Sequence, residues 1–149
     1  MTISVDRPDV PDGYGVPTTD EGLLKWAKVV TELETASQLC YDGAPTTIHA
    51  TNLRANGRCV LHLEDGWRAV IVEGVSGSSE SPGLELGDQI ATAITAKYSD
   101  KGYSPTAESW EGEDAGGLCR FIPAKAMAWF DFPTDMTRFR FDSRRSSGR

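Results

Sequence analysis

The sequence feature that most constrains this fold is a predicted β-hairpin over residues 58–75, RCVLHLEDGWRAVIVEGV. Asp65-Gly66 lies between two runs that are rich in β-branched and other apolar residues. Asp-Gly at such a position favours a two-residue type I′ turn, because both central residues of that turn need positive φ. We therefore predict antiparallel strands in the register that pairs Val60 with Ile71.

Both faces of this hairpin carry apolar side chains. In the predicted register, Val60 and Ile71 lie on one face, whereas Leu61 and Val70 lie on the other. A strand pair that is apolar on both sides is typical of a barrel or sandwich wall, where each face packs against other residues. The hairpin thus predicts a β-rich domain with packing on both sides of the sheet.

A helix is predicted before the hairpin. Thr18 and Glu21 have the spacing of a capping box, in which each side chain bonds a free backbone N–H of the first turn. An apolar stripe that includes Trp26 and Val30 follows at helical spacing. We expect this helix to end near residue 36 and to lie across an open end or face of the barrel.

Two further helices are predicted on either side of the hairpin. Thr46 or Thr47 is expected to cap a short helix that ends at a left-handed Asn56-Gly57 stop. After the hairpin, Ser81 is expected to cap a helix that ends near residue 98. A long polar connection over residues 99–117 follows this helix.

The end of the chain is predicted to be mostly strand. Strands are expected at residues 39–41, 118–122, 126–132 and 137–141, with a break at Pro123. In the last of these, Phe139 and Arg138 point to opposite faces because the residues alternate strictly between apolar and polar. Together the elements predict a mainly β (α+β) fold, a shortened split β-barrel with helices packed on it.

Length and composition limit the organisation and the class of protein. A length of 149 residues favours one domain over residues 18–142, with an irregular arm at 1–17 and a disordered tail at 143–149. The net charge of −7 argues against general nucleic-acid binding, which needs clustered Lys and Arg. There is neither an apolar run long enough to span a membrane nor a signal-peptide pattern, so a cytoplasmic protein without membrane contact is expected.

The histidines and cysteines do not predict a metal site. His49, His62 and the three cysteines lack the spacing of metal ligands. No arrangement typical of a catalytic dyad or triad is present either. We therefore predict neither a metal nor a catalytic side chain.

Several phrases of the sequence resemble one known family. They are DGYGVPTTDEGLLKW at 12–26, YDGAPTTIHATNLRANGRCVLHLEDGWRAVIVEG at 41–74, AKY at 96–98 and AMAWFDFPTDMTRFRF at 126–141. The chain resembles the pyridoxamine 5′-phosphate oxidase-like split-barrel proteins, and within them the flavin- and deazaflavin-dependent oxidoreductases. Relative to that pattern it lacks the first strand hairpin, and Ile48 and Thr51 stand where basic residues are usual.

The resemblance implies a homodimer that binds FMN or a deazaflavin between its subunits. The cofactor then supplies the redox chemistry, while the protein binds and orients it. From the residues themselves, the start of the helix at 46–55 offers free N–H groups for a phosphate. The candidate cofactor-binding residues are Thr46, Thr47, His49, Asn52, Arg54, His62, Trp129 and Arg138.

Two functions from different classes follow from this reading. The first is an FMN- or deazaflavin-dependent oxidoreductase that transfers hydride to or from a small organic molecule. The alternative is a non-catalytic dimeric relative, without cofactor, that acts as an interaction or ligand-sequestering module. A third reading, a chain that completes its barrel with strands of a partner copy, follows from the missing hairpin.

Overall fold

The computed structural model describes residues 2–32, 39–42, 46–63, 67–77, 81–111 and 118–142. The chain forms two compact units. The sheet unit comprises Met1–Glu34, Arg58–Val75 and Ile122–Arg149, and the helix unit comprises Thr35–Gly57 and Ser76–Phe121. The predicted tail at 143–149 lies outside the described residues.

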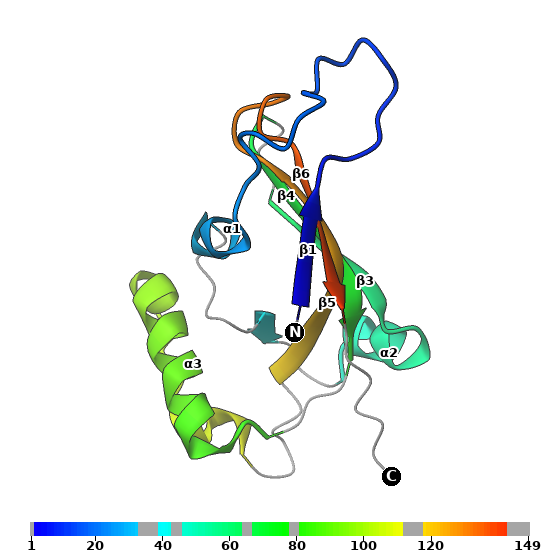
Figure 1. The fold of residues 1–149 in the computed structure, drawn as a ribbon. Coiled ribbons are helices and arrows are strands. Elements are labelled where there is room, and N and C mark those ends of the chain that lie inside the picture. The colour runs from blue at the N-terminus through cyan, green and yellow to red at the C-terminus, as the bar shows by residue number, and fades with distance from the viewer. Residues whose placement is uncertain are drawn as a thin grey trace. The chain divides into compact units, whose positions relative to one another are not determined.

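An open antiparallel sheet forms the sheet unit. Its strands follow the order β1-β6-β5-β4-β3 (Figure 1). They are β1 (Thr2–Asp6), β3 (Arg58–His62), β4 (Ala69–Ser76), β5 (Leu118–Trp129) and β6 (Thr137–Asp142). The prediction of a mainly β fold with helices is confirmed. Among the described strands, however, the path ends at β1 and β3 without closing into a barrel.

The core of the sheet unit lies on one face of this sheet. Phe139 is fully buried and Phe141 nearly so, and both belong to the strictly alternating strand β6. The indole of Trp26, the first residue of α1 (Trp26–Glu32), packs edge-on against both rings, with centroids 5.3 and 4.7 Å apart. The predicted alternation of this strand is therefore confirmed, and α1 covers its apolar side.

Helix α1 begins later than the capping-box pattern predicts. The chain before it is held in turns by tertiary contacts, because Arg7 donates hydrogen bonds to the carbonyls of Thr19 and Glu21. Leu24 N also donates to Thr137 Oγ1 at 2.9 Å. These bonds stabilise a non-helical backbone over residues 18–25, so the predicted helix start at Thr18 is wrong.

The central hairpin forms, but in another register. Val60 lies opposite Glu73 instead of Ile71, a shift of two residues. Such a shift keeps every side chain on its predicted face, so the apolar pattern cannot distinguish the two registers and only the turn can. The predicted turn, Asp65-Gly66, lies outside the described residues. The expected cover on both faces is not found, because Val60 remains 52% exposed.

Two other predictions for the sheet unit are wrong. Residues 2–6 form β1, paired with β6, instead of an irregular arm. Pro123 does not break the chain, and β5 runs continuously from Leu118 to Trp129. Pro123 lies between two ladders of this strand, because pairing with β2 (Leu39–Asp42) ends at Phe121 and pairing with β6 begins at Lys125.

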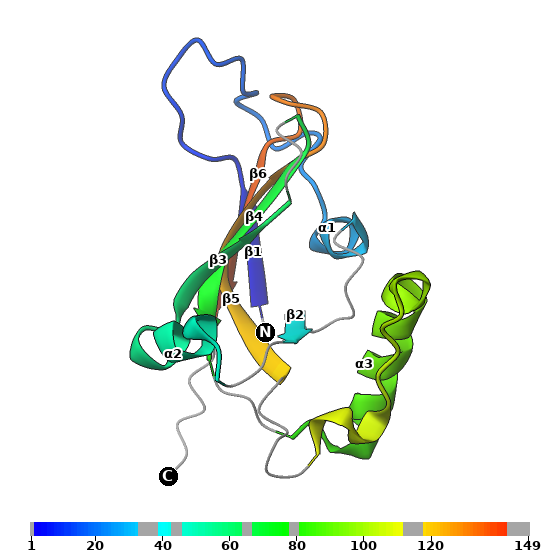
Figure 2. The same ribbon diagram turned by 180° about the vertical axis from the view of Figure 1, so that it is seen from behind.

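The helix unit contains the remaining elements. They are β2, α2 (Ile48–Ala55), α3 (Gly83–Tyr98) and the short 3₁₀ helices η1 (Ser99–Lys101) and η2 (Ala107–Trp110) (Figure 2). Ile90 and Ala91 of α3 pack with Trp110 and Leu118 in a small core. The predicted strand at 39–41 is confirmed by the pairing of β2 with the first residues of β5.

Three local expectations for the helix unit are wrong. Asn56 ends α2 in an extended conformation rather than a left-handed one. Pro82, not Ser81, occupies the N-cap position of α3, although Ser81 Oγ accepts a hydrogen bond from Gly83 N at 3.4 Å. The connection at 99–111 is not simply polar, because Trp110 is 2% exposed. Among the described residues, no helix combines the length and apolarity that a membrane span requires.

Candidate functional site

The eight predicted site residues divide between the two units. Those of the helix unit lie at the start of α2 or on it, namely Thr46, Thr47, His49, Asn52 and Arg54. Those of the sheet unit are His62 at the end of β3, Trp129 at the end of β5 and Arg138 on β6. The helix-unit residues therefore form one local group, which we call the α2 site.

The α2 site is built on a capped helix start. Thr47 is the N-cap, with extended backbone angles, and its Oγ1 accepts a hydrogen bond from Ala50 N at 3.2 Å. The first intrahelical bond runs from Thr51 N to Thr47 O at 3.0 Å. The amides of Ile48 and His49 precede that bond, and Thr46 is exposed beside them. Such an end favours an anion, because its N–H groups and the helix dipole both point toward it.

Arg54 belongs to the last turn of α2 but reaches back along the helix. Its Nη2 donates to Thr51 Oγ1 at 3.0 Å, and that hydroxyl donates to Thr47 O at 3.1 Å. The guanidinium is therefore two hydrogen bonds away from the N-cap residue. Long helical side chains lean toward the N-terminus, so this placement follows from helix geometry. Thr51, which stands where a basic residue was expected, serves here to orient Arg54.

His49 is part of a chain of polar side chains. Its Nε2 lies 3.3 Å from Tyr41 Oη, which in turn lies 2.9 Å from Ser76 Oγ. Ser76 Oγ donates to the carbonyl of Arg120 at 3.0 Å. Tyr41 and Ser76 come from β2 and the last position of β4. The sequence analysis did not identify either residue, because nothing in the local pattern links positions so far apart. Asn52 is exposed on the same helix.

Arg138 is held by a carboxylate. Its Nε and Nη2 each donate to an Asp6 oxygen at 2.9 Å, and Arg140 Nη1 donates to the same carboxylate at 2.6 Å. These hydrogen bonds, with that from Arg138 the strongest, lower the pKa of Asp6 to about 2. Because Asp6 also raises the pKa of Arg138, this arginine is a paired cation rather than a ready ligand for a phosphate.

The other two sheet-unit candidates differ in their surroundings. His62 is exposed and lies opposite Ile71. Trp129 packs edge-on against Phe132, and its Nε1 is a buried donor without a partner among the described residues. A buried donor of this kind costs about 1–3 kcal/mol, so it marks a place where an acceptor would stabilise the protein.

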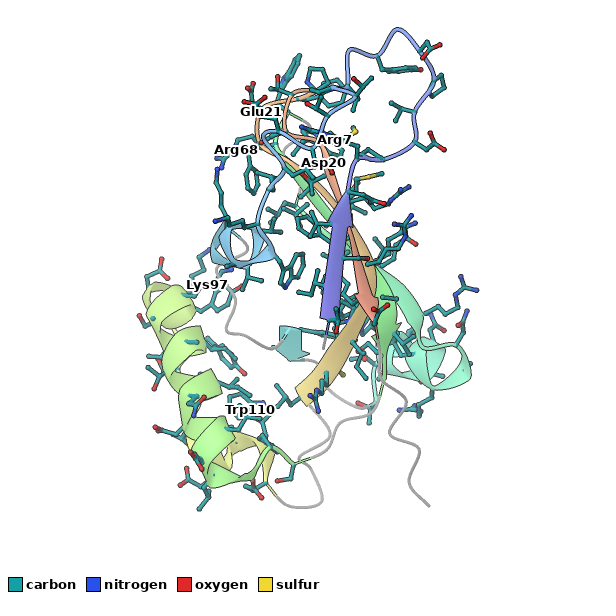
Figure 3. The ribbon with its side chains drawn as sticks, viewed as in Figure 1. Arg7, Asp20, Glu21, Arg68, Lys97 and Trp110 are labelled. Carbon is teal, nitrogen blue, oxygen red and sulfur yellow. The ribbon has the colours of Figure 1, made fainter. Side chains whose placement is uncertain are left out.

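The hollows of the described part of the sheet unit include one of about 720 Å³, which is lined by residues 7–18 together with Arg138. Another, of about 320 Å³, lies on β3 and β4 beside Val60 and Val75. Arg7, labelled in Figure 3, lines the first of them and is held in place, since it also donates to the carbonyls of Thr134 and Met136 at 2.8 and 3.0 Å.

Within the described ranges, no group of three or more His, Cys, Asp or Glu residues could hold a metal ion. The groups of the α2 site are compatible with a phosphate, because a capped helix start carries hydroxyls and leading amides, and the Arg54 cation lies on the same helix. No protein-family model matches this sequence, and a search of curated proteins finds no match for it either.

Proposed function

We propose that this chain is a member of the pyridoxamine 5′-phosphate oxidase-like proteins and binds FMN or a deazaflavin through the α2 site. The observation that carries this proposal is the capped start of α2, with Arg54 turned back toward it through Thr51. The resemblance of residues 41–74 to flavin- and deazaflavin-binding sequences adds the identity of the ligand. The predicted activity is hydride transfer to or from a small organic molecule.

In this proposal the side chains bind and the cofactor reacts. Thr46 and Thr47 would hold the cofactor's phosphate through hydroxyls and leading amides, and Arg54 would balance its charge. A bound flavin or deazaflavin supplies the hydride chemistry. His62 and Trp129 are the proposed contacts outside the α2 site, and Arg138 enters only as a paired cation that shapes its strand.

The test separates loss of the phosphate site from loss of the helix cap. FMN and a deazaflavin are each titrated into the full chain, with absorbance and fluorescence as readouts. The variant Thr47→Asp keeps an excellent N-cap, but its carboxylate repels a phosphate. We expect at least about tenfold weaker binding in Thr47→Asp, equivalent to about 1.4 kcal/mol, and unchanged unfolding.

A matched control is Thr47→Ser, which retains both the cap and the neutral hydroxyl. We expect it to bind as the original chain does. Equal affinity of Thr47→Asp and Thr47→Ser for the cofactor would show that its phosphate does not bind at the start of α2. Absence of saturable binding by a folded chain would refute the proposed function as a whole.

A second candidate function is a non-catalytic dimeric module, and one observation favours it. Val60 and Val75 are 52% and 50% exposed, and they border the 320 Å³ hollow on the sheet. Arg58 and Glu73 also line it, directly opposite Val75 and Val60 on the paired strands, so apolar and charged side chains alternate on this surface. Exposed apolar side chains mixed with charged ones are compatible with a protein–protein interface.

Sedimentation velocity over a range of protein concentrations tests this candidate. If the hollow is a contact between two copies, Val60→Lys weakens association, because it replaces an apolar side chain of the contact by a charged one that must lose its water on association. Ile48→Lys, a change at an exposed residue of the helix unit, serves as control. This surface would be ruled out as a dimer interface if the protein stayed monomeric at all concentrations, or if Val60→Lys left dimer formation unchanged.

A further inference from the structure

The hydrogen bonds that link His49, Tyr41, Ser76 and the Arg120 carbonyl have a defined donor-to-acceptor direction. This direction is set at the Arg120 end. A carbonyl oxygen can only accept, so Ser76 donates its single hydroxyl proton to Arg120 O. Ser76 Oγ must therefore accept the hydrogen bond that joins it to Tyr41, and Tyr41 is the donor. This step holds whatever else Tyr41 contacts, because it depends only on the Ser76 proton.

The same reasoning assigns the protons of His49. Since the phenolic proton of Tyr41 points to Ser76, Tyr41 Oη accepts from the imidazole, and Nε2 of His49 carries the hydrogen. In the neutral ring, Nδ1 then has no proton. The rings of Tyr41 and His49 also pack edge-on with centroids 5.6 Å apart, which limits rotation of the imidazole.

We infer that Tyr41 and Ser76 are positioning residues that hold His49 as the Nε2–H tautomer, so that Nδ1 is a hydrogen-bond and proton acceptor for a ligand. The inference deepens the proposed function, on which its ligand-binding part rests. His49 is exposed, whereas Ser76 at the other end of the chain is 6% exposed. The buried Ser76 therefore fixes the donor-to-acceptor direction of the hydrogen bonds, and the exposed His49 is accessible to a ligand.

A consequence concerns the protonation of the complex. A phosphate dianion offers only acceptors, so a hydrogen bond between it and Nδ1 needs one added proton, carried either by the imidazole or by the phosphate itself. The titratable group in contact with His49 is the Tyr41 phenol from β2. The Arg54 guanidinium lies on the same helix, but its bonds lead through Thr51 to Thr47 and not to His49. Arg120 of β5 contributes its carbonyl, and its residue is exposed. Binding of FMN or a deazaflavin is then accompanied by proton uptake.

The tautomer is tested without any ligand by ¹⁵N–¹H correlation of the imidazole rings in the full chain. The sequence has only two histidines, so His62 of the sheet unit serves as an internal reference. In the neutral form we expect His49 to show a protonated Nε2 and an unprotonated Nδ1. The replacement Ser76→Ala removes the acceptor that fixes the direction of the Tyr41 proton, so His49 should lose its preference for the Nε2–H tautomer.

Two further variants distinguish an effect of the hydrogen bonds on the His49 tautomer from an effect of the packing between the Tyr41 and His49 rings. Tyr41→Phe removes the hydrogen bond and should move the His49 nitrogen shifts toward an average of the two tautomers. Ser76→Thr restores the hydroxyl and should restore the original pattern. Tyr103→Phe, an exposed tyrosine of the helix unit, should leave His49 unchanged. A His49 pattern that is the same in all folded variants would overturn the inference.

Calorimetric titration of FMN in buffers of different ionisation enthalpy measures the proton count. Wild type should take up protons on binding, and Ser76→Ala should take up fewer, because its neutral ring already presents an Nδ1–H in part of the molecules. Equal proton counts would contradict the role in binding. If no cofactor binds but the tautomer pattern is observed, the proposed function fails, whereas the positioning of His49 stands.

Discussion

At the scale of the residue, a single side chain matters most where it makes hydrogen bonds to several backbone groups at once. Arg7 donates to four backbone carbonyls, from Thr19, Glu21, Thr134 and Met136. A planar guanidinium with five donors can connect separate segments in this way, whereas a lysine cannot. The residue thus joins the N-terminal arm to the chain before α1 and to the turn between β5 and β6.

The pairing of Asp6 with Arg138 and Arg140 predicts a pH dependence of stability. The pKa of Asp6 is lowered in the folded chain to about 2, so the pairing stabilises the fold above the unfolded-state pKa of 3.8 and this contribution is lost as the pH falls toward 2. Because the carboxylate side chain is 40% exposed, solvent screening limits the contribution to below about 1 kcal/mol.

Urea unfolding of Asp6→Asn and wild type at several pH values between 7 and 2 measures this contribution. We expect the difference in unfolding free energy to be constant above about pH 5 and to shrink toward pH 2. Asp142→Asn, which changes an exposed carboxylate on β6, is the matched control. A difference that grows on acidification would contradict the pairing.

At the scale of the element, close approach of two backbones determines how η2 lies on α3. A Cβ added to Gly87 would be 2.8 Å from the carbonyl oxygen of Ala107 and 3.4 Å from its Cα. Both residues belong to the helix unit, and the contact brings η2 with the buried Trp110 against α3. The glycine that weakens the helix locally is therefore required for packing.

Gly87→Ala should destabilise the protein even though alanine is the better helix former. Alanine gains about 1 kcal/mol of helix propensity, but the clash with backbone atoms forces a shift that costs about 1–3 kcal/mol or more. Thermal unfolding followed by circular dichroism should show a lowered midpoint. Ala93→Gly, at an exposed position of α3, shows the effect of propensity alone. A Gly87→Ala variant as stable as wild type would disprove the close contact.

At the scale of the whole molecule, the sheet is open and part of its surface is apolar. The described strands end at β1 and β3, and the face that carries Val60 and Val75 is half exposed. Closed barrels remove strand edges, whereas an open sheet keeps two of them available for pairing. The association measured with Val60→Lys therefore also reports whether the molecule covers this surface with a second copy.

Within each unit the sequence by itself determined what depends on neighbours along the chain. The alternation of β6, a cap of α2 at Thr46 or Thr47 and the strand character of the hairpin were all predicted, since each follows from spacing or capping within a few residues. These features require no knowledge of distant segments.

Only the tertiary structure decided the features that depend on distant partners. Arg7 and Thr137 hold residues 18–25 out of a helix, and β5 continues through Pro123, which lies between its ladders with β2 and β6. The two-residue register shift, the pairing of Arg138 with Asp6 and the orientation of His49 by Tyr41 and Ser76 have the same origin. Local patterns specify which face a side chain takes, whereas its partner is selected by long-range hydrogen bonds and packing that form only in the folded chain.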